Sequence, residues 1–199
     1  GRDDVTNCGD ETNLVVAFNE QARLGRHRLN ALADDAVILV ESMWATHPDE
    51  SIRAQWEAAM EELSSRRYRI VEVPMEDQCL TVVDNARRGK NMFVLGMLAW
   101  IYERDLDRCR DQIADTFRKK APEVTERSHA LLEVGYRWAS ENLDFRYDVP
   151  TVPPERDMVV MNGNEAIALG AVAAGMELAA MYPITPATSV SHMLGDVFE

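Results

Sequence analysis

Three short runs of β-branched and aliphatic residues in the first half of the chain constrain its fold more than any other feature. They are LVVAFN (residues 14–19), AVILVES (Ala36–Ser42) and YRIVEV (Tyr68–Val73), the last of which is followed by a proline. Short apolar runs without polar alternation are typical of strands buried on both faces of a parallel sheet. Apolar residues at helical spacing occupy residues 51–66, so the order strand–helix–strand predicts an α/β fold with right-handed crossovers.

The chain from Gly89 to residue 143 reads as helical throughout. The apolar run Met92–Tyr102 predicts a buried helix, or, in one alternative, a helix that forms a subunit interface. Asp105 or Asp107 is placed to cap the next helix, and Pro122 stands near the start of the one after it. We therefore expect a Rossmann-like domain with helices after its sheet.

The segment DFRYDVPTVPPERD (residues 144–157) separates two parts of the chain. It is rich in proline and charge and has no periodicity, which predicts an extended linker. The predicted organisation is a first domain at 1–143, a linker at 144–157 and the start of a second domain at 158–199.

The second domain is predicted to begin with one βαβα unit. Its strands are expected at residues 158–161 and 176–181, with a helix over 162–175 that Gly175 ends and another that runs through Phe198. A single unit of this size cannot close its own core, so we expect it to be completed by parts outside this sequence.

Charge and cysteine usage exclude several classes of function. The formal net charge of -13 disfavours binding to nucleic-acid phosphates, to an anionic membrane face or directly to an acidic carrier protein. The cysteines, Cys8, Cys79 and Cys109, lie far apart, and neither they nor the histidines have metal-ligand spacing. We expect no metal site and reduced thiols in a cytoplasmic protein.

Targeting segments are not evident in the sequence. It shows no signal peptide, and its longest apolar run, residues 91–102, is shorter than the roughly 20 residues that span a bilayer. The short basic clusters SSRRYR and ARRGK are expected to be solvated or to form structural pairs.

Two turns of the second domain carry the most local information. The residues Asn162–Glu165 fit a capping box, although this turn could also border a ligand site. In YPITPAT, Thr185 is placed as a helix N-cap with Pro186 at the first helical position. The same hydroxyl, in a loop stiffened by two prolines at a helix N-terminus, could instead donate to a carboxylate or a phosphate.

These two turns also carry a family resemblance. The stretch NGNEAIALGAVAAGMELAAMYPITPATSV resembles the start of the alpha domain of 2-oxoacid:ferredoxin oxidoreductases, with its G-N-E-A helix and Y-P-I-T-P-[ST]-[ST] loop. Ala187 departs from that pattern. GDETNLVVAFNEQ and GKNMFVLGMLA are similar to the gamma domain, so the chain resembles part of a fused gamma–alpha large subunit of the 2-oxoglutarate type.

The resemblance implies a chemistry and a set of contacts. The family decarboxylates a 2-oxoacid on thiamine diphosphate, passes electrons singly through [4Fe-4S] clusters to ferredoxin and leaves the acyl group on coenzyme A. It implies that Thr185 donates to the 2-oxoacid and, with Ile184, faces the cofactor. Tyr182, Pro183, Ile184 and Pro186 would shape the wall of the substrate site.

The resemblance also implies what lies elsewhere. The resemblance implies that the Mg2+ and diphosphate motif and the cluster cysteines belong to a beta subunit, and that the assembly is a dimer of heterodimers. No catalytic residue is expected within this sequence, which should be inactive alone. The gamma–alpha order favours 2-oxoglutarate, converted to succinyl-CoA as in the TCA cycle of central carbon metabolism.

Alternative functions remain open at this stage. Pyruvate or a branched-chain 2-oxoacid is the nearest variant. A different class is a non-catalytic Rossmann-like assembly module, in which YPITPAT is only a helix cap. A dinucleotide-binding domain is a third reading, but the sequence has no G-x-G-x-x-G.

Overall fold

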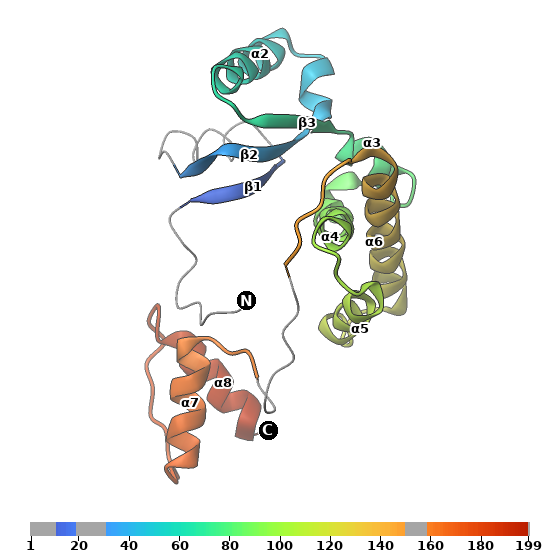
Figure 1. Cartoon of the computed structure of the whole chain (residues 1–199). Coiled ribbons are helices and arrows are strands. Elements are labelled where there is room, and N and C mark those ends of the chain that lie inside the picture. Colours follow the sequence, from blue (N-terminus) through green and yellow to red (C-terminus); the bar gives the residue numbers. More distant parts are fainter. Residues whose placement is uncertain (1–10, 19–30, 150–158, 199) are drawn as a thin grey trace. The chain divides into compact units, whose positions relative to one another are not determined.

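The computed structural model describes residues 11–18, 31–149 and 159–198 of the chain (Figure 1). The chain forms two compact units, Gly1–Thr151 and Val152–Glu199. Asn19, Met158 and residues 150–157 of the predicted linker lie outside the described residues. The predicted domain boundaries stay a prediction.

The first unit contains a parallel sheet with the strand order β1–β2–β3. This confirms the predicted α/β class and the three strands. Helix α2 lies between β2 and β3 along the chain, the other helices follow β3, and short 3-10 helices precede α2 and α4. The elements are β1 (Thr12–Ala17), β2 (Leu32–Glu41), η1 (Ser42–Thr46), α2 (Glu50–Ser64), β3 (Arg69–Val73), α3 (Met75–Leu80), η2 (Ala86–Arg88), α4 (Lys90–Ile101), α5 (Leu106–Thr116) and α6 (Pro122–Asn142).

The central strand β2 explains why the sheet has helices on both faces. Val37 and Leu39 pack into the core formed with α3, α4 and α6, whereas Ile38 and Val40 pack into a second core with α2. Successive side chains of a strand point to opposite faces, so a continuous apolar run needs an apolar cover on each side. Figure 1 shows α2 on one side of the sheet and α4 and α6 on the other.

Helices α4 and α6 make the closest helix contact of the first unit, through two glycines. A Cβ built on Gly96 would lie 2.0 Å from the carbonyl oxygen of Leu132, and one built on Gly135 would lie 1.9 Å from that of Phe93. The two backbones therefore touch where neither residue has a side chain. Because Met97, Leu131 and their neighbours are buried there, α4 is a core helix rather than an exposed interface.

The first part of the predicted linker packs on the first unit. In residues 144–149, the half-buried Phe145 and Tyr147 pack against the core shared with α4 and α6. The Tyr147 amide donates to the Ile101 carbonyl at 2.8 Å, and its hydroxyl donates to the Asn13 carbonyl at 3.3 Å. This stretch is held by the core it crosses and is not a free spacer.

In its described residues, the second unit forms the helices α7 (Gly163–Ala173) and α8 (Thr188–Phe198). Both were predicted, and the left-handed Gly175 (φ 83°) follows α7 as expected. The predicted strands are wrong for the described residues 159–161 and 176–181, which have irregular structure. A strand needs a hydrogen-bonded neighbour, and within the described part of this unit none lies beside them. Val160 is 104% and Leu178 85% exposed.

Over the part of the chain that the structure describes, no helix combines the length and the apolar character that crossing a membrane requires.

Candidate functional site

The loop of residues 182–187 connects irregular chain to α8 and carries every site residue predicted from the sequence. The Ile184 carbonyl accepts from the Thr188 amide at 3.1 Å, which closes a turn over the three residues between them. The peptide bond between Thr185 and Pro186 is cis. Helix α8 begins at Thr188, after this turn.

Thr185 is therefore not the N-cap of α8, and that prediction is wrong. The residue lies within the turn, three positions before the first helical residue, so its hydroxyl is not placed on the first free amides of the helix. Among the described residues, the Thr185 hydroxyl has no hydrogen-bond partner. The competing explanation of this hydroxyl as a purely structural cap thus loses its basis.

The residues around Thr185 are open to solvent in this chain. Tyr182 is 78% and Ile184 58% exposed, and Pro183 and Pro186 are exposed as well. Large apolar side chains on a surface mark a place where something else packs. These residues can form the wall of a pocket only together with atoms from outside the described residues.

The start of α7 folds as its sequence predicts. Asn162 accepts from the Glu165 amide at 3.0 Å, and the Glu165 carboxylate accepts from the Asn162 amide at 2.9 Å, which confirms the capping box. Asn164, in the first turn, donates from Nδ2 to the Pro186 carbonyl at 2.9 Å and to the Ser189 hydroxyl at 2.6 Å. The G-N-E-A turn and the YPITPAT loop, distant in the sequence, therefore lie side by side.

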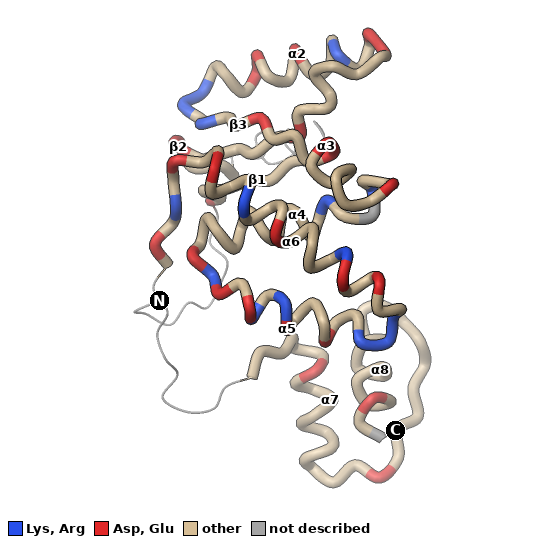
Figure 2. Tube along the Cα trace, turned by 90° about the vertical axis from the view of Figure 1, so that its right-hand side faces the viewer, with Lys and Arg blue, Asp and Glu red and all other residues tan. Residues whose placement is uncertain are grey.

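Lysine and arginine are absent from this region of the sequence. Between residues 158 and 199 the chain has no lysine or arginine, and Figure 2 shows α7 and α8 with acidic positions only. An anion at this loop would be held by the Thr185 hydroxyl and by backbone amides at the start of α8.

A buried charged cluster in the first unit was missed by the sequence analysis. Lys90 at the start of α4 lies between Glu41 at the end of β2 and Glu76 of α3, with Nζ 2.7 and 2.8 Å from their carboxylates. Burial opposes the charge of Lys90, but hydrogen bonds and charges of the two glutamates outweigh it and raise the pKa of Lys90. A charged residue at the end of a buried strand, in VILVES, was the available signal.

The cluster faces a cavity of about 380 Å³ at the carboxyl end of the sheet. Trp44, Asp84 and Arg87 are among the residues that line it, with Glu76 and Lys90. The ends of parallel strands are where open α/β sheets bind ligands. In this case the lysine is fully engaged by carboxylates, which favours a structural role that joins β2, α3 and α4.

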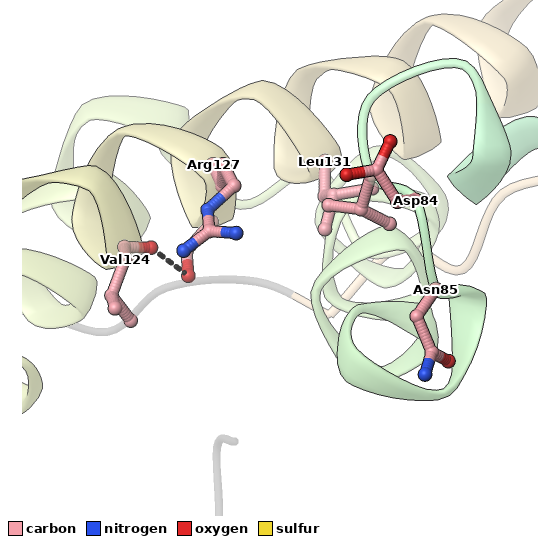
Figure 3. Close-up of a pocket in the computed structure, with 7 residues that line it drawn as sticks. Asp84, Asn85, Val124, Arg127 and Leu131 are labelled. Carbon is pink, nitrogen blue, oxygen red and sulfur yellow. Dashed lines mark hydrogen bonds between the residues drawn. The ribbon is translucent and has the colours of Figure 1, made fainter.

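A smaller cavity of about 250 Å³ lies between the loop at Asp84 and helix α6 (Figure 3). Arg127 and Asp84 come from opposite walls of it, but the Arg127 Nε donates to the Glu123 carbonyl at 3.0 Å. The Ser128 hydroxyl donates to the Val124 carbonyl at 2.7 Å, and a dashed line at Val124 marks a hydrogen bond in Figure 3. These polar groups are used within α6, so the cavity offers little for a ligand.

The cysteines of the described part are free thiols. Burial raises the pKa of Cys79 to about 11, and burial followed by the charge of Asp105 raises the pKa of Cys109. Cys8 lies outside the described residues. The described residues hold no group of three or more His, Cys, Asp and Glu side chains that could bind a metal ion.

Comparisons with known proteins agree on one family. The model of the family described as pyruvate ferredoxin/flavodoxin oxidoreductase matches residues 3–138. The chain is 29% identical over 208 residues to a 2-oxoglutarate oxidoreductase subunit KorA of Mycobacterium tuberculosis, covering 96% of this chain and 31% of that protein.

A solved structure has the same fold. It is a 2-oxoglutarate:ferredoxin oxidoreductase from Magnetococcus marinus with 2-oxoglutarate, coenzyme A and succinyl-CoA bound, with a TM-score of 0.73 and 22% identity over 98% of this chain. The match covers 32% of that protein, so the chain spans about a third of the length of these relatives.

Proposed function

The chain belongs to the pyruvate ferredoxin/flavodoxin oxidoreductase family, and from this membership we propose that it is part of the large subunit of a 2-oxoglutarate:ferredoxin oxidoreductase. The reaction joins 2-oxoglutarate and coenzyme A into succinyl-CoA, releases CO2 and passes the electrons to ferredoxin. The similarity to the 2-oxoglutarate oxidoreductase subunit KorA and to the Magnetococcus marinus 2-oxoglutarate:ferredoxin oxidoreductase supports 2-oxoglutarate over other acids. Pyruvate is the second candidate because the family description names it.

The observation that carries this proposal for the chain's own residues is the free hydroxyl of Thr185. It lies in an exposed turn before α8 and has no partner among the described residues. We assign it the role of donor to the 2-oxoacid, with Ile184 beside it toward the cofactor. Tyr182, Pro183 and Pro186 then contribute apolar surface to the substrate wall, which other parts of the enzyme complete.

The side chains of the loop can be compared with those that the proposed cofactors require. Thiamine diphosphate, when bound, would supply the decarboxylation chemistry. The loop fits the reacting end of such a site, because it offers a hydroxyl and apolar side chains and lacks cations for a diphosphate. We therefore place the Mg2+, the diphosphate motif and the [4Fe-4S] clusters on a beta subunit, in a dimer of heterodimers that reduces ferredoxin.

The proposed setting follows from the reaction. Conversion of 2-oxoglutarate to succinyl-CoA is a TCA-cycle step, so we propose a cytoplasmic enzyme of central carbon metabolism. We also propose that residues 1–143 form a gamma domain and that residues 158–199 begin the alpha domain after a linker at 144–157. Because Phe145 and Tyr147 pack on the first unit, we propose that only the later residues of the linker connect the two domains freely.

The test is reduction of viologen under nitrogen by the complete enzyme with its partner chains. Thiamine diphosphate and coenzyme A are supplied, and 2-oxoglutarate, pyruvate and a branched-chain 2-oxoacid are compared. We expect reduction that requires both 2-oxoglutarate and coenzyme A. Reduction with pyruvate alone would move the substrate assignment to pyruvate. Reduction with none of the acids, with cofactors bound, would favour a non-catalytic assembly module.

A further inference from the structure

We propose that Asn164 is a positioning residue for the loop of residues 182–187, a role whose chemical meaning rests on the function proposed above. Its side-chain amide holds the loop from the neighbouring helix α7, so that the Thr185 hydroxyl is presented in one place. Asn164 does not itself contact the substrate in this proposal; it acts through Thr185.

The hydrogen-bond geometry carries the first step. A side-chain amide has two N–H donors, and Asn164 Nδ2 donates to one acceptor in the loop and to one in the first turn of α8. They are the Pro186 carbonyl at 2.9 Å and the Ser189 hydroxyl at 2.6 Å. The Ser189 hydroxyl donates in turn to the Pro186 carbonyl at 3.3 Å. This closed set of three residues (Asn164, Pro186 and Ser189), the Asn164 clamp, holds the carbonyl of Pro186, the residue that directly follows Thr185.

The loop has few other means to hold its shape. Pro183 and Pro186 have no backbone N–H to donate, and the Thr185 hydroxyl has no partner within the described residues. The bonds from the Thr188 amide to the Ile184 carbonyl and from the Val190 amide to the Ala187 carbonyl join the loop to α8, which directly follows it, but not to α7. Within the described part, the Asn164 clamp supplies the hydrogen-bonded attachment of the loop to α7.

Asn164 is also free for this task. The neighbouring capping box of Asn162 and Glu165 already satisfies the first turn of α7. The Asn164 side chain is thus not needed to cap the N-terminus of α7, and it hydrogen-bonds to the loop and to Ser189 instead. Asn164 lies in the first turn of α7 but does not cap the helix. Its hydrogen bonds to Pro186 and Ser189 therefore indicate that its role is to hold the loop.

The experiment uses the complete enzyme with three variants. Asn164→Leu keeps the approximate shape, adds no charge and removes both donors. Ser189→Ala removes the two bonds of the Ser189 hydroxyl but keeps the bond from Asn164 to the Pro186 carbonyl, so it serves as the milder variant. Asn142→Leu is the matched control, because Asn142 donates from Nδ2 to the Trp138 carbonyl at 2.8 Å in the first unit. The values of kcat and KM for the 2-oxoacid, and KM for coenzyme A, are measured for each.

We expect Asn164→Leu to lower kcat/KM for the 2-oxoacid by about 10- to 100-fold, the range that displacement of a positioned group produces. KM for coenzyme A should not change, Ser189→Ala should have a smaller effect and Asn142→Leu none. When Thr185→Val is already present, adding Asn164→Leu should lower kcat/KM by less than about twofold, because the effects of residues that act through one another are not additive. An equal loss in both backgrounds would overturn the inference.

Hydrogen exchange of the loop amides separates this inference from the proposed function. In the substrate-free enzyme, the amides of Tyr182, Ile184 and Ala187 should exchange faster in Asn164→Leu than in the wild type and the Asn142→Leu control. Unchanged exchange overturns the clamp whatever the activity. Faster exchange in an enzyme that oxidises no 2-oxoacid supports the clamp and overturns the proposed function.

Discussion

At the scale of single residues, Thr185 is the position where structure and function are most directly linked. Because its hydroxyl has no partner in the described chain, replacing it with the similarly shaped valine should leave the melting temperature unchanged. In the complete enzyme, Thr185→Val should lower kcat/KM for the 2-oxoacid by roughly 10- to 100-fold, as expected for a lost hydrogen bond to a charged group. Steady-state kinetics and thermal melting measure both effects.

Thr185→Ser is the control for this prediction. It keeps the hydroxyl and should retain most of the activity. A loss of about 1 kcal/mol in stability for Thr185→Val, with normal turnover, would instead indicate a helix cap. That result would contradict both the turn geometry and the proposed donor.

A second residue-scale prediction concerns Lys90. Lys90→Met leaves the fully buried Glu41 carboxylate without its cation, so unfolding should cost about 3–5 kcal/mol less than in the wild type. Urea unfolding at pH 7 measures the change. Lys119→Met is the control, because Lys119 is exposed and forms no ion pair with the described residues. Its effect should stay within about 0.5 kcal/mol.

The pH dependence of this stabilisation has a definite sign. Glu41 and Glu76 raise the pKa of Lys90 above its usual value of 10.5 against the opposing effect of burial. A group whose pKa is higher in the folded state contributes fully below its unfolded pKa and loses that contribution as pH rises through the folded pKa. The difference between wild type and Lys90→Met should therefore be constant from pH 7 to 10 and shrink above 10.5. Urea unfolding at pH 7, 9 and 11 measures the free-energy difference between the wild type and Lys90→Met. The same difference at all three pH values would contradict this prediction.

At the scale of helices, the glycine contact of α4 and α6 gives the sharpest prediction. Gly96→Ala places a Cβ against the Leu132 carbonyl, which cannot move without shifting α6, so stability should fall by at least about 1–3 kcal/mol. Gly170 in α7 has open space at its Cβ position. There the same substitution should be neutral or stabilise by up to about 1 kcal/mol. Circular dichroism during urea unfolding measures both, and a Gly96→Ala protein as stable as the wild type would contradict the close contact.

Local sequence signals predict an element when its hydrogen bonds are completed within the same segment. They fail when those hydrogen bonds depend on a distant segment. The capping box of Asn162 and Glu165 and the cap of α5 by Asp105 were predictable, because each is completed within one turn. The strands at 159–161 and 176–181 were not, because a strand also needs a partner. Thr185 looked like a cap because a threonine before a proline is a common helix start, and the turn through Ile184 and Thr188 displaces the helix.

At the scale of the whole molecule, distance along the chain limits what could be foreseen. The α/β class followed from three apolar runs, and the family from two turns. The salt bridges of Lys90 join residues from β2, α3 and α4, and the Asn164 clamp joins α7 to the next loop. Such pairings depend on the tertiary fold, and no spacing rule in a single sequence predicts them. The sequence accordingly led to the hypothesis that Thr185 is a donor, but it predicted neither the Asn164 clamp nor the buried Lys90.

The two units should also differ in how strongly they hold their structure. Both hydrophobic cores belong to the first unit, whereas the buried apolar residues of the second, within the described part, are Ala168 and Leu194. So small a core cannot offset the entropy of ordering α7 and α8.

In this chain alone, we expect amides of α4 and α6 to exchange slowly with deuterium and those of α7 and α8 to exchange within seconds to minutes. In the complete enzyme, α7 and α8 should become protected, because Tyr182, Ile184 and Leu178 then acquire neighbours. Equal protection of α7 and α6 in the isolated chain would show that the second unit carries its own stability.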